Sequence, residues 1–227
     1  MDVQKYIEEI NGQFFDKFEK FKDLLIEYNN KFNLTAITDE KSVYIKHFLD
    51  SVAGESFFEK NSSVLEVGSG GGFPSIPLKI IRDDLKFTLV ESTGKKCNYL
   101  NAVVDKLGLN CVKVINGRAE ELAKNVNYRE KFDACTARAV ARLNTLCEYC
   151  LPFVKVGGSF IAYTGGKIDE IQEAEKAIKI LGGELYIKEN YLLSEGLVRS
   201  IVVIKKIANT PSKYPRGQGK ERKCPIK

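Results

Sequence analysis

The spacing of hydrophobic positions changes near residue 63 of this chain. Before that point, apolar and aromatic residues of the segment 5–30 recur at intervals of three and four, which predicts an amphipathic helix. The members of this stripe are Phe14, Phe15, Phe18, Phe21, Leu24, Leu25 and Tyr28. An aromatic stripe at helical spacing indicates a packing face rather than a ligand site.

A second helix is expected after the loop Asn33–Thr38. Thr38 is the expected N-cap, with Asp39 and Glu40 in the first turn, where acidic side chains are favourable. This helix should continue through Lys46–Ser51. Together the two helices predict an N-terminal helical extension over residues 1–60 that packs on the rest of the chain.

From residue 63 onward, short apolar runs alternate with helical stretches. Strands are predicted at 63–67, 86–90, 111–115, 132–136, 159–163, 184–190 and 197–205. Helices are predicted at 75–81, 95–107, 119–124, 139–151 and 168–181. The alternation predicts an α/β domain over 61–206, with a mainly parallel sheet and helices on both faces. The last two strands have a short connection, so the last strand is expected to be antiparallel.

Composition changes this picture little. The 227 residues are 44% hydrophobic and 29% charged, which is typical of a globular domain with an appendage. No apolar run reaches the ~18 residues that a membrane span needs. The segment Met1–Ile10 carries acids and lacks the apolar core of a signal peptide, so we expect a cytoplasmic protein and no membrane contact.

Charge is unevenly distributed along the chain. The segment Lys205–Lys227 holds eight Lys or Arg residues and one acid, whereas the other 204 residues hold 27 basic and 29 acidic residues. The net charge of +5 therefore divides into +7 and −2. Because residues 207–227 are rich in Pro and Gly, we expect a mobile or extended basic arm without a folded element. Such an arm is typical of a polyphosphate-binding protein, and a solubilising tail is the alternative.

The cysteines and the histidine do not predict a metal site. Only Cys147 and Cys150 have metal-like spacing, and the single histidine, His47, is distant in sequence. Cys147 and Cys150 fit one helix face as buried packing. Scattered cysteines without a secretory signal indicate a reducing compartment.

The strongest local signal is a glycine-rich loop after the first predicted strand. It reads Glu66-Val-Gly68-Ser-Gly70-Gly-Gly72-Phe73-Pro74, and Pro74 is expected to begin the next helix. A phosphate-binding P-loop would end in Gly-Lys-Ser/Thr, and a nicotinamide fingerprint would place Gly where Phe73 stands. The acid-x-Gly-x-Gly-x-Gly arrangement resembles motif I of class I S-adenosylmethionine (SAM) methyltransferases, which have a Rossmann-like fold.

Acidic residues follow successive predicted strands. Glu91 ends the second strand, 23 residues after Gly68, where a carboxylate can accept hydrogen bonds from both ribose hydroxyls. The segment Asn116–Glu120 follows the third strand and can lie against an adenine ring. Glu66 can meet the methionine ammonium group. Each acid alone has a structural explanation, but their placement around a topological switch point favours SAM as cofactor.

Several classes of methyl acceptor can be excluded from the sequence. The segment after the fourth strand, Asp133–Arg142, lacks the Asn/Asp-Pro-Pro-Tyr/Phe pattern of adenine amino-group methylases. Cys135 is expected within the strand, so it is a poor candidate for the nucleophile of carbon-5 pyrimidine methylases. The sequence also offers no set of metal ligands of the kind that metal-dependent O-methyltransferases need.

An ordered set of motifs over nearly the whole chain resembles the RsmG (GidB) family. The stretches are Lys31-Phe-Asn-Leu-Thr-Ala-Ile37, Lys46-His-Phe-Leu-Asp-Ser51, Val67-Gly-Ser-Gly-Gly-Gly-Phe-Pro-Ser-Ile-Pro77, Glu91-Ser-Thr-Gly-Lys-Lys96, Ala137-Arg-Ala-Val-Ala141 and Lys213-Tyr-Pro-Arg216. The resemblance implies SAM-dependent methylation of guanine N7 in bacterial small-subunit (16S) ribosomal RNA. The expected partner is this RNA or the small subunit, with the enzyme as a monomer.

The resemblance also implies site residues. With the loop acid and glycines, the expected cofactor contacts are Glu66, Gly68, Gly70, Gly72, Phe73, Glu91, Ser92, Thr93, Ala119, Glu120 and Arg138. The expected RNA contacts are Lys46, His47, Arg199, Lys213, Arg216, Lys220, Arg222 and Lys223. Phe73 and His47 have core packing as their alternative, and Arg138 a surface salt bridge. Where the family's fifth strand commonly ends in Leu-Lys, this chain has Tyr163-Thr164, and Lys167 is a candidate replacement.

Guanine N7 carries a lone pair and no proton, so its methylation needs positioning but no general base. A chain with one histidine and no evident acid–base pair agrees with such a mechanism. The alternatives are a methyltransferase of another RNA, a protein or a small molecule, and a non-catalytic SAM-binding RNA module.

Overall fold

The computed structural model describes residues 8, 10, 12–165, 169–194 and 196–227. Its strands are β1 Ser63–Val67, β2 Lys86–Glu91, β3 Val112–Asn116, β4 Phe132–Arg138, β5 Val154–Thr164, β6 Gly183–Ser194 and β7 Leu197–Lys206. They form one seven-stranded sheet in the order β3-β2-β1-β4-β5-β7-β6. Neighbours from β3 to β5 pair parallel, whereas β7 pairs antiparallel with both β5 and β6. The predicted sheet, including its antiparallel strand, is confirmed.

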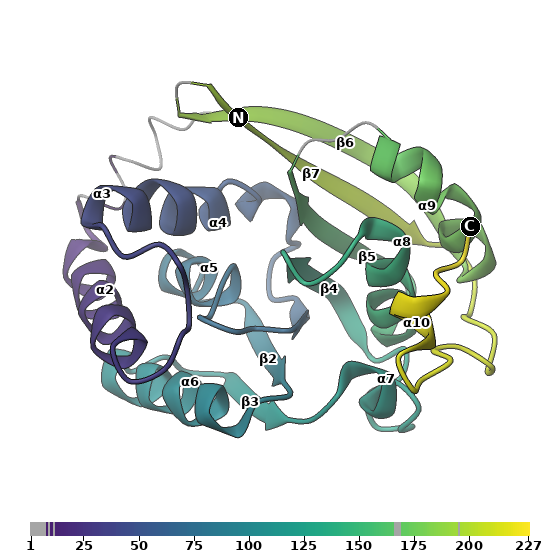
Figure 1. Ribbon diagram of the computed structural model, residues 1–227, viewed down its shortest axis with the longest axis horizontal. Helices are drawn as coiled ribbons and strands as arrows, with labels where there is room; N and C mark the ends of the chain where they lie inside the picture. The colour runs from purple at the N-terminus through teal and green to yellow at the C-terminus, as the bar shows by residue number, and fades with distance from the viewer. Residues whose placement is uncertain (1–7, 9, 11, 166–168, 195) are drawn as a thin grey trace.

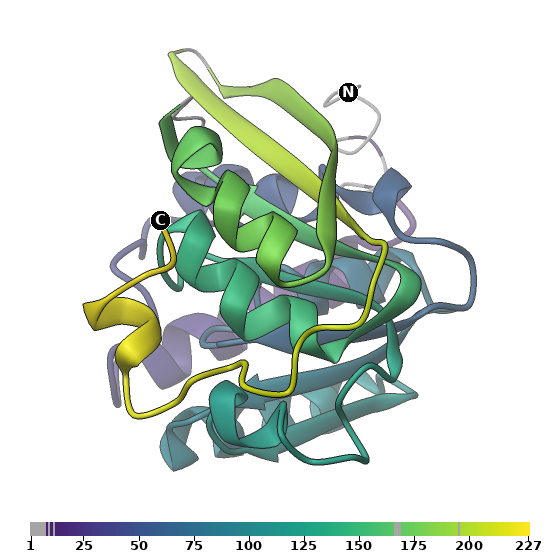
Figure 2. The ribbon, with the colours of Figure 1, turned by 90° about the vertical axis from the view of Figure 1, so that its right-hand side faces the viewer.

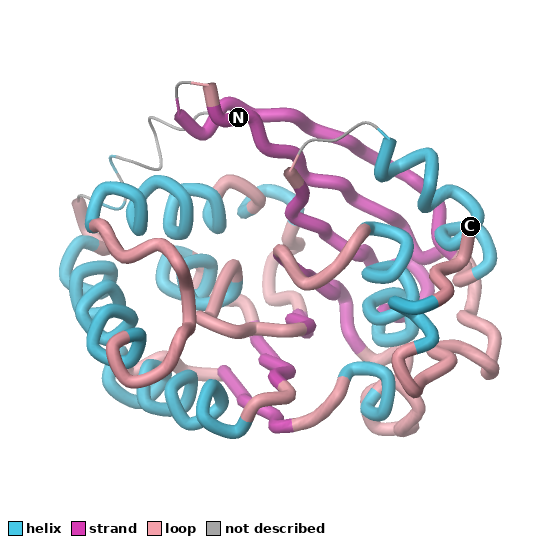
Figure 3. Tube along the Cα trace, viewed as in Figure 1, coloured by secondary structure: helices cyan, strands magenta, loops and turns pink. Residues whose placement is uncertain are grey.

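Helices cover both faces of this sheet (Figures 1 and 3). They are α2 Phe15–Asn29, α3 Glu40–Val43, the π-helix η1 Tyr44–Leu49, α4 Asp50–Val52, the 3-10 turn η2 Glu55–Phe57, α5 Ser75–Ile81, α6 Gly94–Leu107, α7 Ala119–Leu122, α8 Leu143–Cys150, the 3-10 turn η3 Leu151–Phe153, α9 Asp169–Ile180 and α10 Lys220–Lys223. One hydrophobic core lies under the helices from α2 to α6, and a second lies under α7, α8 and α9. The predicted two-sided α/β architecture is therefore confirmed.

The predicted boundaries of β1 and α5 match the structure, whereas β5 begins five residues earlier than expected. The apolar pattern that marks a strand is interrupted at Gly157 and Gly158. A Cβ atom at Gly158 would lie 2.4 Å from the carbonyl oxygen of Asp133. This glycine therefore allows β5 to approach β4 closely, and its lack of a side chain hides the strand from the sequence pattern.

The N-terminal helices pack on the α/β domain through aromatic residues. The Phe48 ring centroid lies 5.0 Å from that of Phe18 and 5.4 Å from that of Phe21, and all three side chains are fully buried. Lys22 of α2 also donates to Glu40 of α3, with 2.6 Å between Nζ and Oε1. The predicted stripe is thus a packing face. The domain boundary at residue 60 stays a prediction.

Two predicted helix-cap assignments are wrong by one residue. Asp39, not Thr38, is the N-cap of α3, because its carboxylate accepts the backbone N–H of Ser42 at 2.8 Å. Pro74 is the N-cap of α5 rather than its first residue. The helix expected through Ser51 is present, but a π-helical turn replaces its middle section. Such turns are frequent at functional sites because they redirect side chains.

The prediction that residues 207–227 lack a folded element is wrong. This C-terminal segment ends in α10 and lies along the helices of the second face (Figure 2). Tyr214 and Glu221 are buried, and Arg129 donates to the carbonyl oxygens of Thr210 and Tyr214 at 2.7 and 2.8 Å. The segment folds because its polar groups find partners in the domain, which a hydrophobic pattern does not reveal.

Among the described residues, no helix combines the length and apolar character that a membrane crossing requires.

Candidate functional site

The glycine loop connects β1 to α5 where the strand order reverses between β1 and β4. This edge of a parallel sheet is the usual position of a nucleotide-binding crevice. Gly68 has φ +71°, and its N–H donates to the Val90 carbonyl at 2.8 Å. A Cβ at Gly72 would lie 2.7 Å from Cγ1 of Ile76. Glycine is thus required at these positions for the turn and for its close packing on α5.

Glu91, at the end of β2, ties the glycine loop to the next turn. Its Oε2 accepts the backbone N–H of Gly70 at 3.0 Å, and its Oε1 accepts that of Thr93 at 2.8 Å. The side chain is buried. Glu91 therefore fixes the crevice edge in this structure, in addition to the ribose role predicted for it.

A cavity of about 310 Å³ opens beside this loop. The predicted cofactor residues that line it are Gly68, Ser92, Ala119 and Glu120. Its other walls come from Val67, Val90, Gly117, Arg118, Val140, Tyr149, Gly219 and Arg222. We call this space the first cavity. Its volume lies at the lower end of the range for small-molecule sites, roughly 300–1,000 Å³.

Buried polar atoms without partners lie beneath the same loop. Both carboxylate oxygens of Glu66 and the hydroxyl oxygens of Ser69 and Ser75 have no partner in regular hydrogen-bond geometry within the described residues, although both serines lie close enough to Glu66 to lower its pKa. Burial raises the pKa of Glu66 to about 7, against the opposing influence of Ser75 and Arg138. Buried polar groups are normally satisfied. This cluster therefore fits a ligand that brings a hydrogen-bond donor or a positive charge, such as the ammonium group predicted to meet Glu66.

A second cavity, of about 350 Å³, lies on the other side of the segment that follows β4. Arg138 and Ala139 line the second cavity, whereas the next residue, Val140, lines the first. Ala139 has φ +57°, which is unusual for a residue with a side chain and marks a constrained turn. The segment Arg138–Val140 thus forms a partition with one cavity on each face.

The second cavity brings together residues from distant parts of the sequence. Its lining is Ile37, Lys46, His47, Asp50, Arg138, Ala139, Tyr163, Thr164, Gly165 and Arg199. Three of the predicted RNA contacts, Lys46, His47 and Arg199, therefore meet there. Arg138, predicted as a cofactor contact, also lines this cavity and not the first one.

Asp50 organises the charges of the second cavity. Its Oδ2 accepts from Nη1 of Arg138 at 2.9 Å, and its Oδ1 accepts from the Tyr191 hydroxyl at 2.8 Å. Nε of Arg199 lies 3.6 Å from the same Oδ1. Asp50 is 4% exposed, so these partners compensate a buried negative charge. The salt-bridge alternative for Arg138 is thus present, but it is buried within the site.

His47 is a fully partnered, neutral imidazole. Its ring stacks on Phe73, with centroids 4.3 Å apart. An arginine can only donate, so Nδ1 accepts from Nη2 of Arg138 at 3.1 Å, and Nε2 donates to the Thr35 hydroxyl at 2.8 Å. Burial and the positive charge of Arg138 lower the pKa of His47 to about 3.

Phe73, in the glycine loop, contacts both His47 and Arg138. The guanidinium carbon of Arg138 lies 4.9 Å from its ring centroid, and the ring also packs against Phe21 at 5.3 Å. The side chain is buried in the first core. The structure thus shows core packing for both Phe73 and His47, which was the alternative to a binding role. His47 also lines the second cavity.

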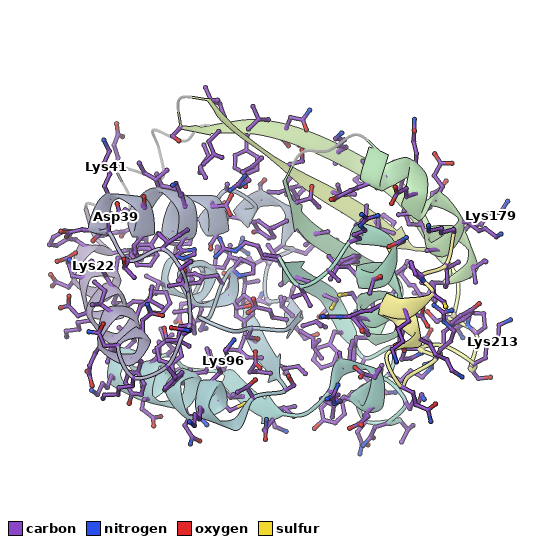
Figure 4. The ribbon with its side chains drawn as sticks, viewed as in Figure 1. Lys22, Asp39, Lys41, Lys96, Lys179 and Lys213 are labelled. Carbon is purple, nitrogen blue, oxygen red and sulfur yellow. The ribbon has the colours of Figure 1, made fainter. Side chains whose placement is uncertain are left out.

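The basic residues of the C-terminal segment are not gathered at the second cavity. Arg216 is paired with Glu148, with 2.7 Å between Nη2 and Oε2, and its predicted RNA contact stays a prediction. Arg222 lines the first cavity. Lys213, Lys220 and Lys223 are exposed, and Figure 4 shows Lys213 at the side of the molecule opposite Lys22 and Lys41. Lys167 lies outside the described residues.

Sequence reasoning gave no role to Asp50, Tyr191, Tyr149 and Val140. Asp50 stands in the motif Lys46–Ser51, so an acid beside two basic residues was a visible signal. Tyr149 and Val140 carried no such signal, because an apolar or aromatic residue in a helix or turn usually belongs to the core.

Cys147 and Cys150 are buried as predicted, whereas Cys111 and Cys224 are exposed. Cys135, Cys147 and Cys150 are fully buried, and Cys135 lies inside β4. In the part of the chain that the structure describes, no three His, Cys, Asp or Glu side chains are grouped as metal ligands.

Solved structures with a similar fold include an O-methyltransferase and a protein in complex with AdoMet. An O-methyltransferase from Bacillus cereus in complex with SAH aligns with a TM-score of 0.58 at 17% identity, covering 82% of this chain and 91% of that one. TYW2 from M. jannaschii, in complex with AdoMet, aligns with a TM-score of 0.54 at 17% identity, covering 70% and 76%. At this identity the likeness confirms the predicted methyltransferase fold.

Sequence relatives are far more similar. The ribosomal RNA small subunit methyltransferase G of Clostridium novyi is 47% identical over 222 residues, covering 96% of this chain and 91% of the relative. The protein of that name from Lactobacillus acidophilus is 45% identical over 233 residues, covering 100% and 97%. The family model GidB, described as rRNA small subunit methyltransferase G, matches residues 15–193. The chain therefore belongs to the rRNA small subunit methyltransferase G family, as the motifs predicted.

Proposed function

We propose that the protein transfers a methyl group from SAM to N7 of a guanine in bacterial 16S ribosomal RNA. The observation that carries this proposal is the pair of cavities that share the partition Arg138–Val140. A methyl transfer needs donor and acceptor on opposite sides of the moving carbon, in line with the bond that breaks. The two cavities adjoin at the neighbouring residues Ala139 and Val140, so a methyl group held in the first can face an acceptor held in the second, and the named relatives act on small-subunit ribosomal RNA.

The first cavity is the proposed cofactor site. SAM supplies a methyl group on a positively charged sulfur, which leaves as a neutral thioether. Gly68, Ser92 and Ala119–Glu120 would form the walls, and Glu91 would hold the loop while reaching the ribose. Glu66, buried and unpartnered within the described residues, would become ionised beside the ammonium group of the amino-acid part.

The second cavity is the proposed acceptor site, and its titratable groups are already occupied. His47 uses both ring nitrogens, and Asp50 accepts from Arg138 and Tyr191. The Tyr163 hydroxyl donates to the Ser51 carbonyl at 2.7 Å. A methylated amino group must lose a proton, whereas guanine N7 has none to lose. A site whose bases are engaged elsewhere therefore favours a ring-nitrogen acceptor.

Basic residues at the second cavity suit a nucleic-acid substrate. Lys46 is exposed at the rim and Arg199 is part-exposed, so both can neutralise phosphates that flank the target base. The base itself has to leave its stack to enter the cavity. The proposal includes a monomeric enzyme in the cytoplasm, where its proposed substrate is assembled.

The decisive experiment uses small ribosomal subunits that lack the modification. We expect incubation with methyl-labelled SAM to label the 16S RNA at one guanine, and nuclease digestion with mass spectrometry to identify 7-methylguanosine. Label in a different nucleotide would contradict the N7 assignment. Cofactor binding without label in either free RNA or subunits would favour a non-catalytic module, and label in a protein or small molecule would favour the other alternative.

The cofactor half of the proposal can be tested alone. Replacing Glu91 with Ala removes the acceptor for the N–H groups of Gly70 and Thr93 and for the ribose. We expect Glu91→Ala to weaken binding of S-adenosylhomocysteine at least tenfold, measured by calorimetry. Glu121→Ala, an exposed acid on α7 outside the cavity lining, is the matched control. Equal affinity for both variants would contradict the role of Glu91.

A further inference from the structure

The C-terminal segment is fixed to the domain at successive points before it reaches the first cavity. The guanidinium of Arg216 pairs with Glu148 of α8, whose side chain is 1% exposed. The hydroxyl of Thr145 donates to the Glu221 carbonyl at 3.0 Å, and the buried carboxylate of Glu221 accepts the backbone N–H of Gly217. These contacts place the turn 217–219 and α10 against α8 (Figure 1).

All three residues of this turn have positive φ, and two of them are glycines. Gly217, Gln218 and Gly219 have φ values of +80°, +57° and +72°. Glycine adopts positive φ without penalty, and this chain reversal directs α10 toward the cavity. The glycines that suggested a flexible arm therefore build a specific turn.

Two residues of the segment complete the lining of the first cavity. Gly219 and Arg222 face the same space as Ser92, Gly117 and Glu120. Nη2 of Arg222 donates to the Val140 carbonyl at 3.3 Å, and its guanidinium also interacts with Tyr149. Arg222 thus contacts both another wall of the cavity and the partition between the two cavities.

We propose that the C-terminal segment is a wall of the cofactor site and that Arg222 contacts the nucleoside part of the bound cofactor. This inference rests on the proposed function. Besides Val67, Gly68, Val140 and Tyr149, the residues that line the cavity with Arg222 lie at the ends of β2 and β3, namely Val90, Ser92 and Gly117–Glu120, whereas Glu66, the predicted partner of the ammonium group, and Arg138 do not line it. The nucleoside end is therefore the end that Arg222 can reach. A planar guanidinium suits it, because it can stack on a purine and donate hydrogen bonds in one plane.

This role differs from the phosphate contact that the basic sequence suggests. A phosphate contact would be served by any cation at this position, and its loss would leave cofactor affinity unchanged. A wall residue acts on the cofactor in the absence of RNA. The two roles are therefore separable by binding measurements on the protein alone.

The test measures binding of two ligands to the full chain by calorimetry. S-adenosylhomocysteine carries both the nucleoside and the amino-acid part, whereas 5′-methylthioadenosine lacks the amino-acid part. We expect Arg222→Ala to weaken both ligands by the same factor, about tenfold. Arg222→Lys keeps the charge but loses the planar donor group, so it should recover little of this loss. The matched control is Lys124→Ala, an exposed cation that adjoins Gly217 and does not line the cavity.

Each outcome separates this inference from the proposed function. Wild-type affinity of Arg222→Ala for both ligands, or full recovery by Arg222→Lys, would overturn the wall role while leaving the cofactor site in place. A loss for S-adenosylhomocysteine alone would assign Arg222 to the amino-acid end and also contradict the inference. If the wild-type protein binds neither ligand, the proposed function itself fails. Because Arg222 is exposed, thermal unfolding of its variants should match the wild type.

Discussion

The two ends of the chain each supply a wall to one cavity, but they are held in place by different forces. The N-terminal end brings Lys46, His47 and Asp50 to the second cavity on helices that pack through the fully buried side chains of Phe18, Phe21 and Phe48. The C-terminal end brings Gly219 and Arg222 to the first cavity through ion pairs and hydrogen bonds. Hydrophobic burial needs no exact geometry, whereas a buried ion pair depends on one partner at one position. Substitutions should therefore destabilise the two walls in different ways: by leaving a cavity in the N-terminal wall and by leaving a buried charge without its partner in the C-terminal wall.

The largest expected effect is the loss of Phe48, which holds the N-terminal wall. Its ring contacts Phe18, Phe21, Tyr44 and Phe73 with centroids 5.0 to 6.2 Å apart. We expect Phe48→Ala to lower the free energy of unfolding by about 4 kcal/mol, since it leaves a cavity in the core. Denaturation in urea measures this change.

Phe15→Ala is the control for Phe48, because the Phe15 side chain belongs to the same helical stripe but is 43% exposed. Its substitution should cost less than about 1 kcal/mol. Equal effects of the two variants would mean that the aromatic stripe does not hold this wall.

A slightly smaller effect is expected for the ion pair that holds the C-terminal wall. Arg216→Ala leaves the buried Glu148 carboxylate without its cation, which should lower the free energy of unfolding by about 3 kcal/mol. Adding Glu148→Gln removes the buried charge while its amide oxygen still accepts the backbone N–H of residue 216. The double variant should therefore be more stable than Arg216→Ala alone in the same urea titration. A double variant of lower stability would show that the segment is held by other contacts.

The same difference explains what the sequence could predict. The N-terminal helices and the sheet were predictable because burial imposes a period on the apolar residues, as in the stripe from Phe14 to Tyr28. The glycine loop was predictable because positive φ restricts the residue type. The C-terminal docking was not, since Arg216 and Glu148 lie 68 residues apart and nothing local marks either as a partner. For the same reason Arg222 acquired its place in the cavity lining only when the fold brought its neighbours together.

A pH titration sharpens the comparison at the N-terminal wall. The pKa of His47 is lowered to about 3 in the folded protein, from an ordinary value of 6.5. As the pH falls below 6.5, the unfolded chain binds a proton that the folded protein does not, so stability is lost. Between pH 8 and pH 5 the contribution of His47 to the free energy of unfolding should fall by about 2 kcal/mol. Urea denaturation of the wild type and His47→Gln at each pH measures it.

The difference between these two proteins isolates the histidine, which is the only one in the chain. Burial raises the pKa of Glu66 to about 7, so protonation of Glu66 favours the folded state as the pH falls through the same window. That contribution is common to both proteins and cancels in the comparison. A pH-independent difference would mean that His47 can be protonated in the folded state, contrary to its burial between Phe73 and Arg138.

The smallest expected effects concern the exposed lysines of the C-terminal segment, Lys213, Lys220 and Lys223. Deleting the whole segment would also remove Tyr214 and Arg216, which are part of the packed structure, so single substitutions are the cleaner test. If these lysines meet phosphates, each change to Ala should weaken RNA binding modestly and reduce the slope of log affinity against log salt by about 1. Titrations of labelled RNA at several salt concentrations measure this slope.

The affinity for S-adenosylhomocysteine separates the two surfaces of the segment. It should be unchanged in the lysine variants and reduced in Arg222→Ala, because Arg222 lines the first cavity and the three lysines do not. An unchanged salt slope in the triple lysine variant would leave the rim of the second cavity, with Lys46 and Arg199, as the main phosphate contact. The C-terminal end would then act on the cofactor alone, and the N-terminal end would carry the RNA contact.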